Sequence, residues 1–156
     1  MMPNKKDKAP EFSLPDKDGK IHSLKDIKSK NVVVYFYPTD NTPGCTIEAI
    51  EFTKTLPELE RLGIAVLGIT GGDKETKTKF CKDHNLKVTL LSDTDFSISK
   101  KYGVYGEKSF MGRTYLGIKR ITFLLDKEHK IIKVFDTVKP ATHAQEIIEF
   151  VKSCSA

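Results

Sequence analysis

The sequence predicts an α/β fold in which helices flank a central mixed β-sheet. Residues 32–37 and 64–70 are continuous runs of β-branched, aliphatic and aromatic residues, the pattern of strands buried on both faces. A helical stretch separates these runs, and the order strand, helix, strand implies a right-handed crossover and a parallel pair. Residues 120–125 and 131–135 are mostly apolar and flank a polar turn, which indicates an antiparallel hairpin. Parallel and antiparallel pairs together make the sheet mixed.

The remaining elements follow from shorter patterns. Residues 11–24 hold two alternating runs around Asp18-Gly19, a dipeptide favoured in hairpin turns, so we expect an N-terminal β-hairpin that caps one end of the fold. Residues 103–117 contain four glycines and no periodic pattern, which predicts a long loop of the kind that borders sites. The other expected elements are helices over 73–84, 95–102 and 142–152 and a short strand over 88–91.

Length and composition indicate one soluble domain over residues 1–156. A chain of this length buries about two-thirds of its unfolded surface around one core. Hydrophobic residues make up 38% of the chain and charged residues 30%, and no apolar run approaches the roughly 18 residues of a membrane span. The N-terminal segment MMPNKKDKAP lacks the apolar stretch of a secretory signal. We therefore expect a cytoplasmic protein without membrane contact.

Charge and cysteine content argue against three classes of protein: nucleic-acid-binding proteins, disulfide scaffolds and metal-binding proteins. The net charge of +5 comes from lysines scattered among acids, so we expect no nucleic-acid partner. The three cysteines, Cys45, Cys81 and Cys154, are too few for a secreted disulfide scaffold and form neither a CxxC nor a metal-binding cluster. We expect no metal and no cofactor. In a reducing compartment such cysteines are either inert core residues or carry chemistry.

The segment around Cys45 has the features of an activated thiol. Thr42 is placed to cap a helix, and Pro43 suits its first turn, so Cys45 falls in that turn. Unpaired backbone N–H groups and the helix dipole favour a thiolate there. Pro57 is expected to kink or end this helix. The alternative is that Cys45 is a small buried residue without a chemical role.

Residues 35–48 read Tyr-Phe-Tyr-Pro-x-Asp-x-Thr-Pro-Gly-Cys-Thr-x-Glu and contain the arrangement Pro38-x-x-x-Thr42-x-x-Cys45. This arrangement resembles the peroxidatic signature of the peroxiredoxins, and the longer segment is similar to that of the bacterioferritin comigratory protein group, or Q type. Further similarity to the group lies in residues 9–16, 103–108, 117–124 and 138–140. The resemblance covers nearly the whole chain. It implies a thioredoxin-like fold and thiol-dependent reduction of hydrogen peroxide and organic hydroperoxides, an antioxidant function.

The resemblance also implies roles for individual residues. Cys45 as a thiolate attacks the hydroperoxide and becomes a sulfenic acid. Thr42 hydrogen-bonds the sulfur and the peroxide, and Arg120 holds the thiolate and stabilises charge as the O–O bond breaks. Pro38 shields the sulfur from water. Glu48, one turn after Cys45, is expected to be structural or a neighbour of Arg120.

The resemblance leaves open which thiol resolves the sulfenic acid. Many members of the group carry the resolving cysteine five residues after the first, but Ile50 occupies that position here. Cys81, 36 residues after Cys45, matches the other pattern of the group, and Cys154 is the minor alternative. A bridge from Cys45 to Cys81 requires part of both helices to unwind. Thioredoxin, or a similar dithiol, is the expected reductant of the disulfide.

Other classes remain as alternatives. A thioredoxin-type oxidoreductase needs a CxxC, a cysteine hydrolase needs a nearby imidazole, and the glycines of residues 68–72 lack the spacing of a nucleotide loop. A redox sensor that uses Cys45 without turnover is the non-enzymatic alternative. The expected oligomeric state is a monomer, with a weak dimer as the alternative. The preferred peroxide stays open, although the expected loop after Gly103 could admit organic ones.

Overall fold

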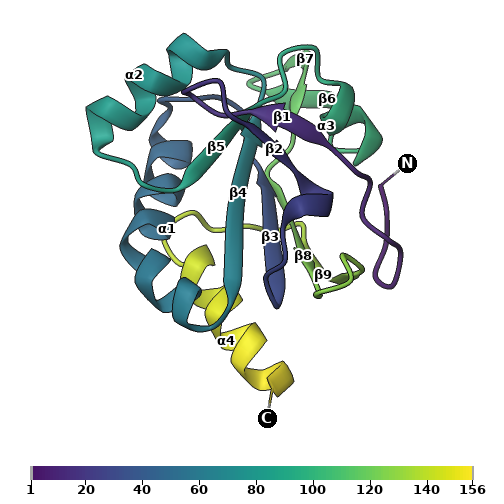
Figure 1. The fold of residues 1–156 in the computed structure, drawn as a ribbon. Coiled ribbons are helices and arrows are strands. Elements are labelled where there is room, and N and C mark those ends of the chain that lie inside the picture. The colour runs from purple at the N-terminus through teal and green to yellow at the C-terminus, as the bar shows by residue number, and fades with distance from the viewer. Residues whose placement is uncertain (1, 156) are drawn as a thin grey trace.

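The computed structural model describes residues 2–155, which form three β-sheets with helices packed around the largest of them (Figure 1). The central sheet has five strands in the order β5-β4-β3-β8-β9. A two-stranded hairpin, β1-β2, precedes it in the chain, and a second hairpin, β6-β7, is inserted before β8. Within residues 2–155, no helix combines the length and the apolar character needed to cross a bilayer.

The central sheet is mixed, as the sequence predicts. β4 runs parallel to β3 and β5 runs parallel to β4, whereas β8 is antiparallel to β3 and β9 is antiparallel to β8. The helix α1 (Pro43–Arg61) makes the crossover between β3 and β4. The five strands are β3 (Asn31–Phe36), β4 (Ile64–Thr70), β5 (Thr89–Ser92), β8 (Ile121–Leu125) and β9 (Ile131–Phe135).

Alternate residues of β3 point into two separate cores. Val33 and Tyr35 belong to a core that also holds buried residues of α1, α2 (Lys74–His84) and α4 (His143–Ser155). Val32 and Val34 belong to the opposite core, which is closed by the N-terminal segment and by α3 (Ser97–Lys101). Both faces of β3 are therefore buried, which explains its continuous apolar sequence.

The N-terminal hairpin is present where the sequence predicts it. β1 (Ser13–Pro15) pairs antiparallel with β2 (Ile21–Ser23), and the 3₁₀ helix η1 (Leu24–Asp26) follows. Gly19 in the turn has a φ of 82°, a left-handed conformation that glycine adopts without strain. The turn reaches toward α2 and covers one end of the central sheet (Figure 1).

The predicted long loop over residues 103–117 is wrong, because this segment forms a hairpin. β6 (Tyr105–Phe110) pairs antiparallel with β7 (Arg113–Ile118). Met111 and Gly112 between them have φ values of 52° and 80°, as a tight two-residue hairpin turn requires. Residues 113–116 of β7 are all exposed, so the strand shows no alternation of buried and exposed residues. A strand without such alternation gives no periodic signal in the sequence.

Pro57, expected to kink or end the helix, does not end it, because α1 continues through it to Arg61. Proline removes one backbone hydrogen bond from a helix interior. Phe52 and Leu59, one on each side of Pro57, are fully buried in the core shared with α4. This packing outweighs the loss of a single hydrogen bond.

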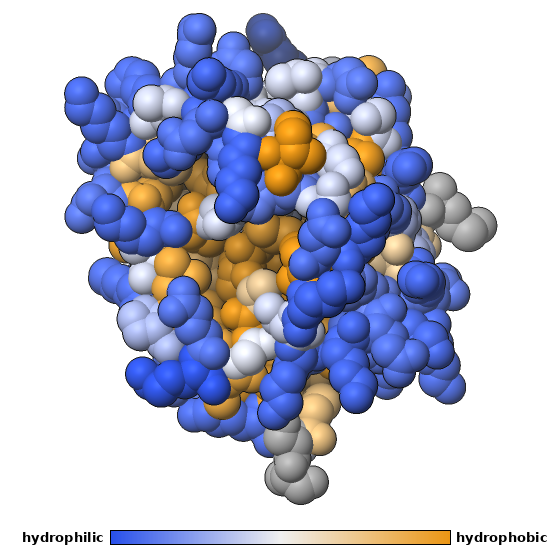
Figure 2. Space-filling model, in the orientation of Figure 1, coloured by the Kyte–Doolittle hydropathy of each residue, from blue (hydrophilic) through white to orange (hydrophobic). Residues whose placement is uncertain are grey.

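Among the described residues, β5 covers only part of one edge of β4. β5 pairs only with Leu67–Thr70, so the first half of β4 has no partner strand on that side. Figure 2 shows an apolar hollow over this part of the sheet, surrounded by hydrophilic residues. A cavity of about 390 Å³ lies here, with Leu56, Ile64 and Val66 among its lining residues.

Candidate active site

Cys45 lies in the first turn of α1, directly above the end of the central strand β3. After β3, the backbone N–H of Tyr37 still donates to the carbonyl oxygen of Ile69 in β4, at 3.1 Å. The chain then turns through Pro38 and enters α1 at Pro43. Cys45 is only 1% exposed. Its sulfur therefore sits at the N-terminal end of a helix, where free N–H groups and the dipole favour negative charge.

Arg120 reaches Cys45 because of the register between β8 and β3. Phe36 pairs with Ile121, so Arg120, one residue earlier, lies level with the loop that follows β3. The guanidinium contacts two acidic groups of α1. Its Nη2 donates to Cys45 Sγ at 3.3 Å, and its Nη1 donates to Glu48 Oε1 at 2.7 Å. The sequence prediction that Glu48 neighbours Arg120 is thus confirmed.

The charges of this cluster influence one another strongly. Burial alone would lower the pKa of Arg120, but the nearby Cys45 sulfur and Glu48 carboxylate raise it above its ordinary value. Burial raises the pKa of Glu48 to about 7, although Arg120 opposes this rise. Glu48 is 1% exposed, and its Oε2 has no hydrogen-bond partner among the residues that the structure describes. Glu48 is therefore partly protonated at neutral pH.

Thr42 and Pro38 lie in the loop before α1, and both are half-buried. Thr42 occupies the N-cap position with an extended backbone, and its carbonyl oxygen accepts from Thr46 N at 2.8 Å. The prediction that Thr42 is the N-cap residue is thus confirmed, although its hydroxyl donates to the carbonyl oxygen of Thr39 at 3.2 Å and makes no side-chain cap hydrogen bond. Pro38 is held by Thr70, whose hydroxyl donates to its carbonyl oxygen at 3.2 Å.

Gly44 gives Arg120 the space to approach the thiol. A Cβ atom at position 44 would lie 3.1 Å from Arg120 Nη2, closer than side chains normally pack. Any other residue there would require the guanidinium to shift by a few tenths of an ångström. This requirement gives a physical reason for the glycine that directly precedes the cysteine, which sequence reasoning left without a role.

Cys81, on α2, borders the same core as Cys45. It is 7% exposed, and both cysteines belong to a buried cluster that includes Tyr37 and Phe80. Burial raises the pKa of the Cys81 thiol, while Lys17 opposes this rise. All three cysteines are free thiols in the structure, and Cys154 is exposed near the end of α4.

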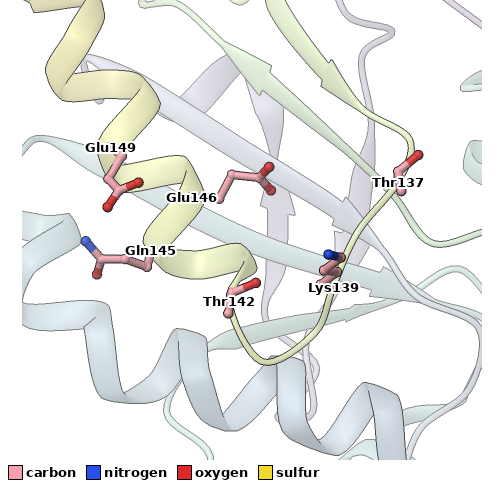
Figure 3. A pocket seen from close by; sticks show the side chains of 6 residues that line it. All are labelled: Thr137, Lys139, Thr142, Gln145, Glu146 and Glu149. Carbon is pink, nitrogen blue, oxygen red and sulfur yellow. The ribbon is translucent and has the colours of Figure 1, made fainter.

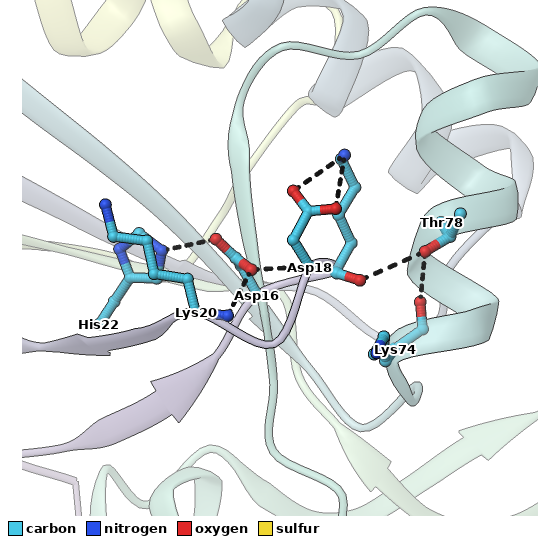
Figure 4. A network of polar contacts seen from close by, with 7 residues as sticks. Asp16, Asp18, Lys20, His22, Lys74 and Thr78 are labelled. Atoms are coloured by element: carbon cyan, nitrogen blue, oxygen red, sulfur yellow. Dashed lines mark hydrogen bonds and ion pairs between the residues drawn. The ribbon is translucent and has the colours of Figure 1, made fainter.

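The turn of the N-terminal hairpin lies over Cys81. A cavity of about 270 Å³ is lined by Cys81 and by residues of this turn. Figure 4 shows the polar contacts that fix the turn. The Asp16 carboxylate accepts from Lys20 N at 3.0 Å and contacts the His22 ring at 2.8 Å, and Thr78 of α2 donates to the carbonyl oxygen of Lys17 at 3.4 Å. The cavity therefore lies between Cys81 and a turn that is fixed in place by these contacts.

Sequence reasoning missed two charged residues near the cysteines, Asp40 and Lys77. They form a fully buried ion pair between the loop before α1 and the helix α2. Lys77 has the helical spacing of Phe80 and Cys81, which places it on the buried face of α2. A lysine on an apolar helix face is a signal for a buried acidic partner, although its position does not identify that partner.

A separate groove of about 480 Å³ lies between α4 and the chain that leads into it, shown in Figure 3. Its walls are polar, with Lys139, Gln145 and Glu146 among them, and neither Cys45 nor Cys81 lines it. Within residues 2–155, no group of three histidine, cysteine or acidic side chains is arranged to bind a metal ion. The chemistry-bearing cluster is therefore the one around Cys45 and Arg120.

Comparison with known proteins gives consistent matches. The AhpC/TSA family profile matches residues 6–134. Peroxiredoxin Bcp of Escherichia coli strain K12 is 45% identical over 146 residues, which cover 94% of each protein. A putative peroxiredoxin bcp of Haemophilus influenzae is 43% identical over 145 residues, or 93% of this chain and 94% of that protein.

Solved structures match this fold over nearly the whole chain. The bacterioferritin comigratory protein of Xanthomonas campestris, studied for its alkyl peroxide reduction activity, superimposes with a TM-score of 0.85. It is 31% identical, and the match covers 93% of this chain and 92% of that one. A peroxiredoxin Q mutant of Xylella fastidiosa gives a TM-score of 0.92 at 31% identity, over 100% of this chain and 99% of that one. These matches confirm the predicted thioredoxin-like fold.

Proposed function

The chain belongs to the AhpC/TSA family and is a peroxiredoxin, a thiol peroxidase, and on this premise we propose that Cys45 is its peroxidatic nucleophile. The observation that carries the proposal is the 3.3 Å contact between Arg120 Nη2 and Cys45 Sγ at the start of α1. A guanidinium and a helix N-terminus on one sulfur favour the thiolate, which is the reactive form. Cys81 and Cys154 instead lie toward the C-terminal ends of α2 and α4, away from a helix N-terminus.

In the first step, the Cys45 thiolate attacks the terminal oxygen of the hydroperoxide. A bond forms between sulfur and that oxygen, the O–O bond breaks, and its electron pair leaves with the second oxygen. The leaving oxygen takes up the proton that the thiol released and departs as water or alcohol. The sulfur is oxidised to a sulfenic acid while the peroxide is reduced.

Three neighbours support this step in the proposal. Arg120 stabilises the thiolate and the charge that develops on the departing oxygen, since its guanidinium stays protonated at any working pH. Thr42, at the N-cap of α1, turns its hydroxyl from the Thr39 carbonyl toward the bound peroxide and aligns it. Pro38 keeps water from the sulfur. The positions of Thr42 and Pro38 in the loop before α1, and the contact of Arg120 with Cys45, support these roles.

We assign the resolving step to Cys81. Its thiolate attacks the sulfenic sulfur, the S–S bond forms and the S–O bond breaks, and the departing oxygen takes up the proton that the Cys81 thiol released and leaves as water. Cys81 borders the same core cluster as Cys45, whereas Cys154 is exposed near the end of α4. We infer that the two helices loosen in this step, so that the two Cα atoms come within the about 7 Å that a disulfide requires.

A dithiol protein, which we take to be thioredoxin, supplies the two electrons that restore both thiols. Such a cycle suits the reducing cytoplasm, where stable disulfides are rare. We propose that residues 1–156 work as one domain and as a monomer, since Cys45, Arg120 and Cys81 all come from a single chain. Both hydrogen peroxide and organic hydroperoxides fit the proposed chemistry.

Turnover and mass spectrometry test these assignments. Wild-type protein with thioredoxin, its reductase and NADPH should consume hydroperoxide continuously, and Cys45→Ser should abolish this consumption. After one equivalent of peroxide, wild type should contain a Cys45–Cys81 disulfide. Cys81→Ser should instead trap oxidised Cys45, while Cys154→Ser should behave as wild type. A disulfide that includes Cys154 would refute the assignment of Cys81.

A further inference from the structure

A buried ion pair joins the loop before α1 to α2. Lys77 Nζ lies 3.1 Å from Asp40 Oδ2, and both side chains are fully buried. Lys77 Nζ also donates to the carbonyl oxygen of Gly72 at 2.8 Å, and the Tyr37 hydroxyl donates to Asp40 Oδ1 at 2.6 Å. Each charged group thus has two hydrogen-bond partners, which offsets part of the cost of its burial.

The pair connects two segments that rearrange in the proposed cycle. Asp40 lies five residues before Cys45, and Lys77 lies one helical turn before Cys81 on the same face of α2. Formation of a disulfide between the two helices requires movement of at least one of these segments. Asp40 and Lys77 would have to part, or move together, for that rearrangement.

Gly72, which precedes α2, provides the space for this pair. A Cβ atom at position 72 would overlap Asp40 Oδ2, so any side chain larger than hydrogen displaces the carboxylate. Gly72 therefore has a role in packing. This role explains one of the glycines of residues 68–72, whose spacing does not fit a nucleotide-binding loop. It also offers a way to disturb the pair without removing either charge.

Two further polar contacts between the loop and α2 are exposed. Asn41 Nδ2 donates to Asp83 Oδ2 at 3.1 Å, and Asn41 Oδ1 contacts His84 Nε2 at 2.8 Å. Exposed polar contacts of this kind contribute little, because water and salt compete for them. The buried pair is the stronger link, since removal of one partner leaves an uncompensated charge in the core.

We propose that Asp40 and Lys77 are positioning residues that form a latch between the peroxidatic loop and the resolving helix. The latch keeps Cys45 beside Arg120 for reaction with peroxide. It also slows the rearrangement of the loop and α2 that lets Cys81 reach the oxidised sulfur of Cys45. This inference rests on the proposed function, because it concerns the lifetime of the Cys45 sulfenic acid. While the latch is closed, a second hydroperoxide can transfer an oxygen to that sulfur, giving a sulfinic acid and water or alcohol.

The test compares reduced wild type with the double variant Asp40→Asn/Lys77→Met. The amide keeps an acceptor for the Tyr37 hydroxyl, and the thioether keeps most of the lysine's length, so no charge remains buried alone. Hydrogen exchange is followed by mass spectrometry over residues 38–46 and 74–84. We expect exchange in both segments to be about tenfold faster, a coupling typical of contacting residues, with β3 and β8 unchanged. Unchanged protection in either segment would overturn the latch.

The second measurement is the fate of oxidised Cys45. After one equivalent of hydrogen peroxide, the double variant should form the Cys45–Cys81 disulfide about tenfold faster than wild type. It should also need more peroxide for half-conversion of Cys45 to the sulfinic acid. Disulfide formation at the wild-type rate, or more slowly, would contradict the proposal, because the pair would then not oppose separation.

Two further variants complete the experiment. Gly72→Ala keeps both charges but displaces the Asp40 carboxylate, and it should change exchange and disulfide formation in the same direction. It replaces the double variant in the test if circular dichroism shows that the double variant is unfolded. Lys79→Met, which removes the exposed Lys79–Asp83 pair from the same helix, is the matched control and should behave as wild type.

The latch and the proposed function fail in distinguishable ways. Hydrogen exchange is measured on reduced protein and needs no peroxide chemistry. A wild-type protein that forms no Cys45–Cys81 disulfide would refute the resolving step, while the exchange result would still decide whether the pair joins the two segments. A normal disulfide with unchanged exchange would refute the latch alone.

Discussion

Replacement of Glu48 by glutamine should stabilise the protein increasingly as the pH rises. Glu48 is buried, and its pKa rises from 4.5 to about 7 on folding. Between these values the unfolded chain has lost the proton that the folded protein still holds, so stability falls as the pH increases. At about 1.36 kcal/mol per pKa unit, ionised Glu48 costs the fold about 3 kcal/mol above pH 7.

Glutamine removes the charge but keeps an oxygen that can accept from Arg120 Nη1, so the variant lacks this pH-dependent cost. Most of the cost develops between pH 5 and pH 8. Over that range, the free energy of unfolding of Glu48→Gln minus that of wild type should increase by about 2 to 3 kcal/mol.

Urea unfolding of the two reduced proteins at pH 5 and pH 8 measures this difference. Histidines and the remaining carboxyl groups titrate alike in both proteins, so their contributions cancel. A difference in unfolding free energy that is the same at both pH values would refute the reasoning. It would mean that Glu48 is already ionised at pH 5, with Arg120 fully offsetting its burial.

Three further outcomes are expected. Arg120→Met should slow the reaction of reduced protein with hydrogen peroxide about 100-fold, as measured by competition with a peroxidase, and a rate within threefold of wild type would contradict its role. Gly68→Ala should lower the free energy of unfolding, measured in urea, by about 1–3 kcal/mol, because its Cβ would lie 2.6 Å from the Tyr35 ring. An unchanged free energy of unfolding would show that the core side chains can move to make room for the methyl group. Burial lowers the pKa of His143, so its contribution to stability should fall as the pH drops through 6.5, opposite in sign to that of Glu48. The melting temperature of His143→Gln minus that of wild type should therefore rise between pH 7 and pH 5, and a constant difference would argue against this.

The sequence predicts those parts of the structure that depend on local patterns. The run at residues 32–37 reads as a strand buried on both faces because both of its faces do contact core. Cys45 could be placed at a helix start because Thr42 and Pro43 are residues that begin helices. Each of these signals lies within a few residues of the feature that it predicts.

Features that depend on partners distant in the sequence could not be predicted in this way. The hairpin after Gly103 is held by cross-strand pairing, and its exposed second strand has no buried face to leave a pattern. Lys77 and its partner Asp40 are 37 residues apart, and Arg120 is 75 residues from Cys45. Local spacing cannot reveal such pairs, and only the resemblance to a family suggested the role of Arg120.

The cost of Glu48 to stability raises the question of why an acid occupies this position. An ionised carboxylate holds a guanidinium more firmly than an amide does, and a firmly held Arg120 points its second nitrogen at Cys45. Glu48→Gln should therefore react with hydrogen peroxide about three- to tenfold more slowly than wild type at pH 8, where it is also the more stable protein. At pH 6, where Glu48 is mostly protonated, the two rates should converge. Equal rates at pH 8, measured by the same peroxidase competition, would show that the charge of Glu48 has no part in orienting Arg120.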